Sequence, residues 1–373
     1  MKLYDQCLAM AVGVCFGALQ TALAQPPAYD THATQLDHPR YRVSVLRNIP
    51  MGTYTVPLAI NNAGQVLGWA FDQGVCNPLG CGAVWTELEP TLLGTVPHAL
   101  FTRPVAFNDH GQSVGLIYFK GPDDAAITPP VGIHYPFKAV VWNGTEPTLL
   151  PSLPADWSAT ATSINNEGEI VGYSEKVTVG QRGLIWHDAK PRYVAPCTYQ
   201  PLVNDEGQIV CWTASENDPL VFIGGGTVTD LPQLAGGDST ASAINDSGQI
   251  VGSSASRAGV GRATYWHQDK IAVLHSSHTE YSSANGDGIN SQGNIVGYAT
   301  TAKGRQYAAL WPETTSEPID LNTVISQSDA AEVTLSEAVG INDKCEIAVA
   351  GHDNHGKLQS YVLTLTEGND CGP

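Results

Sequence analysis

Ser239-Thr-Ala-Ser-Ala-Ile-Asn-Asp-Ser-Gly-Gln-Ile-Val-Gly252 is the stretch that decides the fold, because its central phrase occurs seven times along the chain. The phrase is an apolar residue, Asn, two variable residues and Gly, followed by an apolar run. Its copies place the repeat Asn at Asn61, Asn108, Asn165, Asn204, Asn245, Asn290 and Asn342. Intervals of 39 to 57 residues between these Asn residues predict a repeat architecture.

Each copy of the phrase is expected to form a tight turn between two strands. In the fifth unit, Ala243 and Ile244 end one strand, and Gln249 to Gly252 begin the next. Asn opens such a turn by accepting hydrogen bonds from backbone amides ahead of it, and Gly closes it at positive φ. Polar and apolar residues alternate after the turn, as strands require.

A second signal, a small residue three positions before a Trp, marks a third strand. It occurs as Ala139 with Trp142, Gly183 with Trp186, Ala263 with Trp266 and Ala308 with Trp311. The position of the Trp is held by Trp85 in the first unit, Phe222 in the fourth and Leu363 in the last. A polar turn such as 268–269 and a fourth strand such as 271–274 follow. Four short strands in each unit of about 40–50 residues are typical of a propeller blade, with the Trp residues buried between blades.

The two ends of the chain predict a closed ring. After Asn342 there is room for only two strands, 346–350 and 359–365, and residues 41–47 can supply the missing fourth strand. We therefore predict an all-β, seven-bladed β-propeller of four-stranded antiparallel blades over residues 41–366, its last blade closed by the N-terminal strand. This arrangement covers strand edges that would otherwise pair with other chains.

Residues 1–24 are predicted to be a secretion signal peptide. Lys2 gives a basic start, residues 8–24 are mostly apolar and small, and Ala22-Leu23-Ala24 fits a cleavage site. Residues 25–40 are expected to form a flexible N-terminal segment, and residues 367–373 a C-terminal tail. We expect a secreted or periplasmic protein without membrane insertion.

Charge limits the possible partners. The chain has 36 Asp and Glu against 18 Lys and Arg, a formal net charge of -18. This acidity argues against nucleic acid, which is bound by basic surfaces, and against an anionic membrane surface. We expect a monomer with an extracellular glycan or protein partner.

Six cysteines lie outside the signal peptide, and an even number in an exported chain suggests disulfides. We predict the pairs Cys76–Cys81, Cys197–Cys211 and Cys345–Cys371. The first pair brackets a four-residue loop, and the second lies seven residues either side of Asn204. In the third pair, Cys345 replaces the turn Gly, and Cys371 follows a strand that ends on the same face.

The predicted strand order also decides which loops share a face. With strands A to D counted from the axis outward, the Asn-x-x-Gly turns and the C–D turns lie on one face, which we call the turn face. The B–C and D–A loops lie on the other, the loop face. Binding chemistry is usually carried by such longer, variable loops.

The repeat also resembles a known family. Residues 243–252, preceded by Asp230-Leu231…Leu234…Gly236-Gly237 and followed by an Ala-x-x-Trp strand, resemble the HAF repeats of bacterial extracellular proteins, and the resemblance covers roughly residues 41–366. It implies export and a propeller-like shape. It implies no common chemistry, so no catalytic residue is carried over. This chain departs from the pattern at Cys345, Cys211, Phe222 and Leu363.

Motifs that would define an activity are missing. The sequence has no nucleotide loop, zinc helix, nucleophile elbow or EF-hand loop. Residues 245–248 are better explained as a hairpin turn than as a calcium loop. His275 with His278 and His352 with His355 have a spacing that could chelate a metal, but such residues are more often solvated. We expect no cofactor and no metal.

The candidate ligand contacts are His, Arg and aromatic residues on the loop face. They are His98, Arg103, His134, Tyr135, Trp157, Tyr199, His275, His278, Tyr281, Arg305, His352 and His355. We predict a binding scaffold for a glycan, a peptide or a partner surface.

Two alternatives stay open. One is a polysaccharide lyase, in which a His or Tyr acts as base and an Arg neutralises a carboxylate; its catalytic candidates are His275, His278, Tyr281 and Arg103. The other is a structural surface protein.

Overall fold

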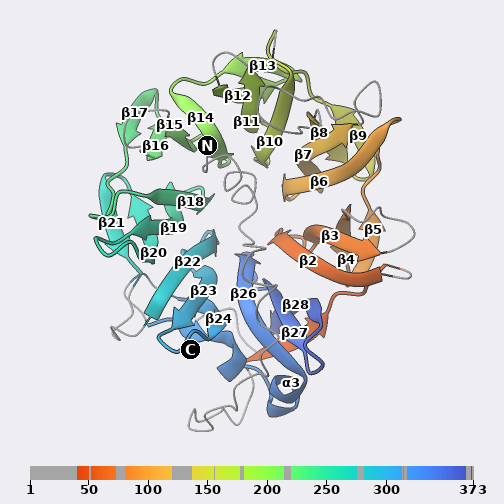
Figure 1. Cartoon of the computed structure of the whole chain (residues 1–373), viewed down its shortest axis with the longest axis vertical. Helices are drawn as coiled ribbons and strands as arrows, with labels where there is room; N and C mark the ends of the chain where they lie inside the picture. The colour runs from red at the N-terminus through yellow and green to blue at the C-terminus, as the bar shows by residue number, and fades with distance from the viewer. Residues whose placement is uncertain are drawn as a thin grey trace.

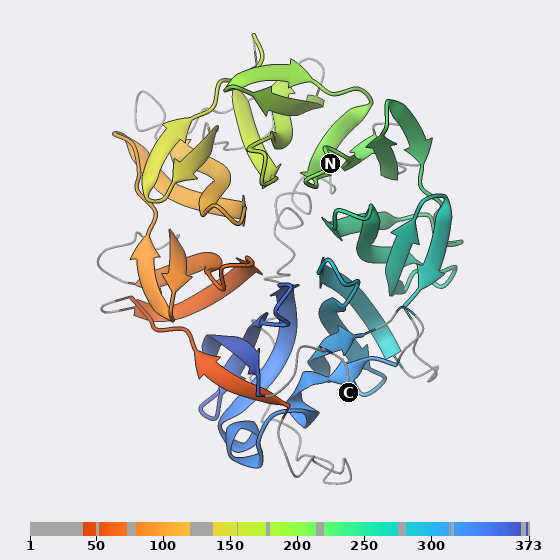
Figure 2. The ribbon, with the colours of Figure 1, turned by 180° about the vertical axis from the view of Figure 1, so that it is seen from behind.

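The computed structural model describes residues 40–49, 52–72, 80–119, 137–154, 156–176, 180–213, 220–274, 281–312, 314, 317–366 and 371. They form seven separate four-stranded antiparallel sheets arranged in a ring, which is the predicted seven-bladed β-propeller (Figure 1). The view from behind shows the same closed circle of blades (Figure 2).

Six blades are built from consecutive stretches of chain, each ordered from the axis outward. Blade 1 has β2 (Gly52–Ile60), β3 (Val66–Asp72), β4 (Cys81–Thr86) and β5 (Glu89–Leu92). Blade 2 has β6 (Ala99–Phe107), β7 (Gln112–Phe119), β8 (Phe137–Asn143) and β9 (Glu146–Leu149). Blade 3 has β10 (Ser158–Ile164), β11 (Ile170–Lys176), β12 (Gly180–His187) and β13 (Lys190–Tyr193).

The next three blades repeat this plan. Blade 4 has β14 (Cys197–Val203), β15 (Ile209–Thr213), β16 (Leu220–Gly224) and β17 (Thr227–Asp230). Blade 5 has β18 (Ser239–Ile244), β19 (Gln249–Ala255), β20 (Gly261–His267) and β21 (Lys270–Val273). Blade 6 has β22 (Tyr281–Ile289), β23 (Ile295–Thr301), β24 (Gln306–Trp311) and β25 (Ile319–Asp320).

Blade 7 is built from both ends of the described chain. It has β26 (Val333–Ile341), β27 (Ile347–Asp353), β28 (Leu358–Leu365) and, as its outer strand, β1 (Tyr41–Val45). β1 pairs antiparallel with β28, with Tyr41 opposite Leu365 and Val45 opposite Tyr361. The prediction that the N-terminal strand closes the ring is therefore confirmed.

The connection from blade 6 to blade 7 departs from the repeat. The outer strand β25 has only two residues, and η1 (Leu321–Thr323) and α3 (Gln327–Glu332) follow it. Both helices begin at a polar cap, because the Asp320 side chain accepts from the Asn322 amide and the Ser326 side chain accepts from the Asp329 amide. Nowhere in the described ranges is a helix long and apolar enough to cross a membrane.

The Trp residues of the third strands are buried plugs, as predicted. Trp85, Trp142, Trp186, Trp266 and Trp311 are each at most 1% exposed. Four of them also donate from Nε1 to a carbonyl in the chain that enters their blade, as Trp142 does to Gly94 over 2.8 Å. These four Trp side chains therefore join neighbouring blades both by packing and by a hydrogen bond, whereas the buried Trp311 Nε1 has no partner among the described residues.

Two of the three predicted disulfides are present. Cys197 pairs with Cys211 across β14 and β15, and Cys345 pairs with Cys371. Cys81 is also disulfide-bonded, but its predicted partner Cys76 lies outside the described residues. The Cys345–Cys371 bridge ties the inner turn of blade 7 to the end of the chain.

Candidate functional site

The turn face is organised by a ring of hydrogen bonds between the repeat Asn residues. Asn61 Oδ1 accepts from the amides of Ala63 and Gln65, which confirms the predicted turn. Asn61 Nδ2 donates to Gln65 Oε1 over 3.0 Å and to the carbonyl of Asn108 in the next blade over 3.1 Å. The same inter-blade bond recurs at all seven repeat Asn residues, over 2.8–3.2 Å, and closes from Asn342 to Asn61.

A second ring lies one residue further along each turn. In six of the seven steps, a backbone amide donates to an Asn or Asp side chain of the next blade over 2.7–2.9 Å. The ring residues are Asn62, Asp109, Asn166, Asp205, Asp246, Ser291 and Asp343. Asn and Asp alternate along part of this ring, so the Asn62 and Asn166 side chains donate hydrogen bonds to Asp109, Asp205 and Asp343.

A polar cavity of about 200 Å³, open to solvent, lies inside these two rings. It is lined by the repeat Asn, the residue before it and the residue after it from every blade. Asp205 and Asp246 are neighbours without an Asn between them. Burial, together with the charges of Asp205 and Glu206, raises the pKa of Asp246, although a hydrogen bond from the Asp205 amide opposes this shift. Most polar groups here already have hydrogen-bond partners within the protein. The turn face therefore serves principally to close the ring of blades.

The loop-face half of blades 1 to 4 carries a set of aromatic residues that we call the aromatic arc. Its members are Tyr54, Trp69, Phe71, Phe101, Tyr118, Phe137, Trp157, Tyr173, Tyr199 and Trp212. Within blades, Tyr54 stacks on Phe71 at 4.5 Å between ring centroids, and Phe101 stacks on Tyr118 at 4.2 Å.

The aromatic arc continues from blade to blade. Phe137 of blade 2 meets Trp157 at 6.0 Å, and Tyr173 of blade 3 meets Tyr199 of blade 4 at 4.9 Å. Tyr199 in turn contacts Trp212 at 5.8 Å. Several of these rings are only half-buried, so the arc keeps apolar surface accessible on the loop face.

Arg103 is the only basic residue on the seven inner strands. Its guanidinium lies over the Trp69 ring, 5.2 Å from the centroid. Burial raises the pKa of Tyr118, and the charge of Arg103 and its hydrogen bond to Tyr118 oppose this shift. In the described part of the chain, the buried Trp69 Nε1 has no hydrogen-bond partner. Arg103 therefore places a guanidinium within the aromatic arc.

A buried ion pair holds the loop that carries Trp157. The Asp156 side chain is fully buried and accepts from Arg182 Nη2 and from Ser174 Oγ. The Trp157 amide donates to the Glu175 carbonyl over 3.1 Å. These contacts fix the entry into blade 3, and with it the position of Trp157 against Phe137.

The structure brings together three of the sequence-predicted ligand contacts, Arg103, Trp157 and Tyr199, in or beside the aromatic arc. His98 is exposed in the loop between blades 1 and 2. His134, Tyr135, His275 and His278 lie outside the described residues, and of Tyr281 only the backbone at the start of β22 is described.

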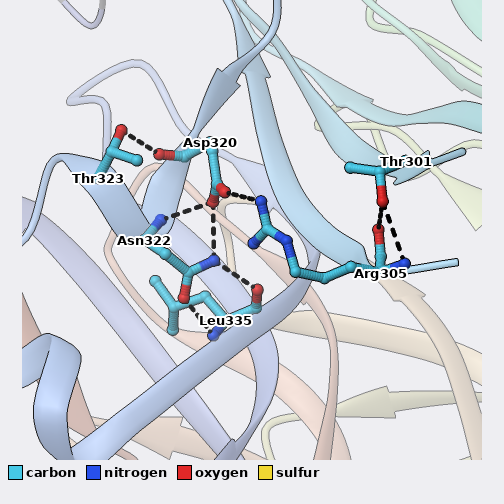
Figure 3. A network of polar contacts seen from close by, with 6 residues as sticks. All are labelled: Thr301, Arg305, Asp320, Asn322, Thr323 and Leu335. Carbon is cyan, nitrogen blue, oxygen red and sulfur yellow. Dashed lines mark hydrogen bonds and ion pairs between the residues drawn. The ribbon is translucent and has the colours of Figure 1, made fainter. Parts of the chain in front are cut away.

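Arg305 belongs to a network between blades 6 and 7 (Figure 3). Its guanidinium donates to Asp320 Oδ2 over 2.8 Å and lies 5.1 Å from the centroid of the Tyr307 ring. Asp320 also accepts from Asn322, whose side chain bonds both the amide and the carbonyl of Leu335. Arg305 thus fastens the irregular connection to blade 7.

The two remaining predicted contacts lie in blade 7. Burial lowers the pKa of the half-buried His352, and the charge of Asp353 opposes this shift. His355 is exposed in the turn after β27, where its amide donates to Asp353 Oδ1 over 2.9 Å. Among the residues that the structure describes, no group of three or more His, Cys, Asp or Glu is arranged to hold a metal ion.

Most of the aromatic arc was missed from the sequence, although the repeat contains a signal for it. Tyr54 and Phe101 both lie seven residues before the repeat Asn, and Phe71 and Tyr118 both lie ten residues after it. Trp69, Tyr173 and Trp212 each lie eight residues after it. Counting aromatic residues by their offset from Asn would have found these seven members, although not the contacts between them.

Comparisons with known proteins identify the fold. No family model matches the sequence, and no curated protein matches it. The chain is similar to the extracellular domain of a putative one-component system from B. thetaiotaomicron, with a TM-score of 0.50 at 8% identity over 88% of this chain and 40% of that one.

Two further structures are similar at a slightly lower score. The β-propeller domain of the trilobed protease from Pyrococcus furiosus has a TM-score of 0.49 at 11% identity, over 74% of this chain and 85% of that one. YCF48 bound to D1 peptide has a TM-score of 0.49 at 11% identity, over 91% of this chain and 99% of that one. At such identities the likeness concerns the fold alone.

Proposed function

We propose that this protein is an exported binding propeller that holds a glycan or peptide ligand on its loop face. The observation that carries the proposal is the aromatic arc, with Arg103 of blade 2 over the Trp69 ring of blade 1. Flat aromatic faces with a few fixed polar groups are the usual composition of a site that binds such ligands.

The chemistry of the arc favours a ligand with a carboxylate. Arg103 supplies the only positive charge on the inner strands, and its guanidinium lies over the Trp69 ring. A guanidinium binds carboxylates through paired charge-assisted hydrogen bonds. The aromatic rings would contact the apolar face of a sugar ring or of a peptide side chain.

Export is part of the proposal. The two disulfides with both partners described are typical of an oxidising compartment. Residues 1–24 have the composition of a secretion signal. A loop face with accessible aromatic surface suits a protein that meets its ligand outside the cytoplasm.

The test is a binding screen with the mature chain on an array of uronate oligosaccharides, matched neutral oligosaccharides and acidic peptides. We expect carboxylate-bearing members to bind and expect binding to fall at least tenfold in Arg103→Ala. Lys138→Ala, which removes a basic side chain from β8 of the same blade, serves as the control and should bind like the wild type. Binding that Arg103→Ala leaves unchanged would contradict the proposed site.

A further inference from the structure

The inner strands share an irregularity three residues before the repeat Asn. At this position each inner strand has a bulge, so one residue falls out of the pairing register with the second strand. The residues are Leu58, Val105, Thr162, Pro201, Ser242, Asp287 and Val339. Bulges re-aim side chains, and Asp287 is the only ionisable residue among the seven.

Asp287 has an acidic neighbour in the next blade. Burial, together with the charge of Asp287, raises the pKa of Glu337 on β26 well above its usual value. Burial raises the pKa of Asp287 to about 7, and a hydrogen bond from Asn285 opposes this shift. The two strands approach closely here, because a Cβ added to Gly288 would lie 2.9 Å from the Cα of Gly340.

Two buried acceptor atoms beside Asp287 and Glu337 lack a hydrogen-bond donor among the described residues. Asn285 Nδ2 donates to Asp287 Oδ1 and, over 3.3 Å, to Ser242 Oγ. The buried Asp287 Oδ2 and Asn285 Oδ1 have no partner within the described ranges. Both atoms are acceptors, so the group that would satisfy them is a donor or a cation.

No cation of the described chain takes that place. The only basic residue on the inner strands, Arg103, lies over Trp69 on blade 1. No ion pair to Asp287 or Glu337 is present among the described residues. The acids of the turn face differ, because Asp109, Asp205 and Asp343 accept hydrogen bonds from amides of the ring.

We propose that Asp287, Glu337 and Asn285 form a calcium site between the inner strands β22 and β26 of blades 6 and 7. Two carboxylates and an amide oxygen, with the Ser242 hydroxyl nearby, make an all-oxygen set that suits a hard cation. Calcium accepts irregular oxygen geometry and keeps waters in its shell, whereas magnesium demands a near-ideal octahedron. This site is separate from the ligand site on the loop face, and its test uses no loop-face ligand.

The test is calorimetric titration of the chelator-treated mature chain with Ca²⁺ at neutral pH, with thermal unfolding as a second readout. We expect one saturable site and a Tm that rises by about 3–5 °C when Ca²⁺ exceeds its Kd a hundredfold. Asp287→Asn and Glu337→Gln keep the shape of the side chains and should each weaken Ca²⁺ binding at least tenfold. Asp246→Asn removes an acid of the turn face and should bind Ca²⁺ as the wild type does.

Three results would overturn the proposal. The first is a wild type that does not respond to Ca²⁺, including one that is stabilised only by acidification, which would mean that the two carboxyls share a proton. The second is full Ca²⁺ binding in both Asp287→Asn and Glu337→Gln. The third is loss of Ca²⁺ binding in Asp246→Asn, which would move the site to the turn face.

Discussion

The turn face and the loop face are built from opposite ends of the same inner strands, yet they are constrained differently. On the turn face every blade contributes the same Asn to a closed ring of hydrogen bonds. On the loop face, blades 1 to 4 carry the aromatic arc. Closing a ring requires seven compatible units, whereas the aromatic arc uses only four of the seven blades. Repetition therefore marks the structural face, and variation marks the binding face.

The largest loss of stability on the turn face should come from the closing blade 7, where Cys345 replaces the turn Gly at a φ of 60°. Removing the bridge with Cys345→Ala and Cys371→Ala should lower the free energy of unfolding by about 3–4 kcal/mol, because the bridge closes a loop between residues 26 apart. Urea unfolding of the double variant measures this. A loss under about 1 kcal/mol would show that the tail does not secure the ring.

The next effect concerns the ring of repeat Asn residues. Asn61→Ala removes four hydrogen bonds and leaves the buried Asn108 carbonyl without its side-chain donor, so we expect a loss of about 2–3 kcal/mol. Asn354→Ala, in an exposed turn of blade 7, is the matched control and should cost less than about 0.5 kcal/mol. Equal losses in the two variants, measured by urea unfolding, would remove the distinction between the faces.

The loop face should respond in binding rather than in stability. Arg103→Lys keeps the charge but loses the planar contact with Trp69, so affinity for a carboxylate-bearing array member should fall about threefold to tenfold, with less than about 1 kcal/mol lost in stability. Calorimetric titration and urea unfolding give the two values. If the free energy of unfolding falls by more than the free energy of binding, Arg103 is a structural residue rather than a ligand contact.

The smallest expected effect is a gain in the free energy of unfolding, caused by a substitution on the turn face. Asp246 has a raised pKa in the folded state, so its contribution to stability is greatest below pH about 4 and declines as pH rises through the folded pKa. Because its side chain is largely solvated, Asp246→Asn should add only about 0.5 kcal/mol at pH 7 and nothing at pH 3. Unfolding curves at both pH values test this, and a lower stability of the variant at pH 7 would be the contrary result.

The sequence was sufficient for the fold because the repeat phrase determines turn, register and blade count together. The same spacing placed Tyr41 beside the last strand and paired four of the cysteines. It gave no warning of the helices between blades 6 and 7, which are set by the caps Asp320 and Ser326.

The candidate site was only partly predictable. Arg103, Trp157 and Tyr199 were singled out, but the aromatic arc depends on contacts between blades that no spacing within one unit reveals. The electrostatic effect of Asp287 on Glu337 joins a bulged residue of blade 6 to a residue of blade 7. Such contacts arise from the curvature of the ring, and they become visible only when neighbouring units are placed beside one another.

Hydrogen–deuterium exchange of the mature chain, with and without the tightest-binding array member, tests the central claim most directly. The account predicts added protection in segments 54–71, 101–118 and 199–212, which carry most of the aromatic arc, and no change in the Asn-x-x-Gly turns of blades 5 and 6. Protection confined to the seven turns around the polar cavity would place the ligand on the turn face and contradict the account.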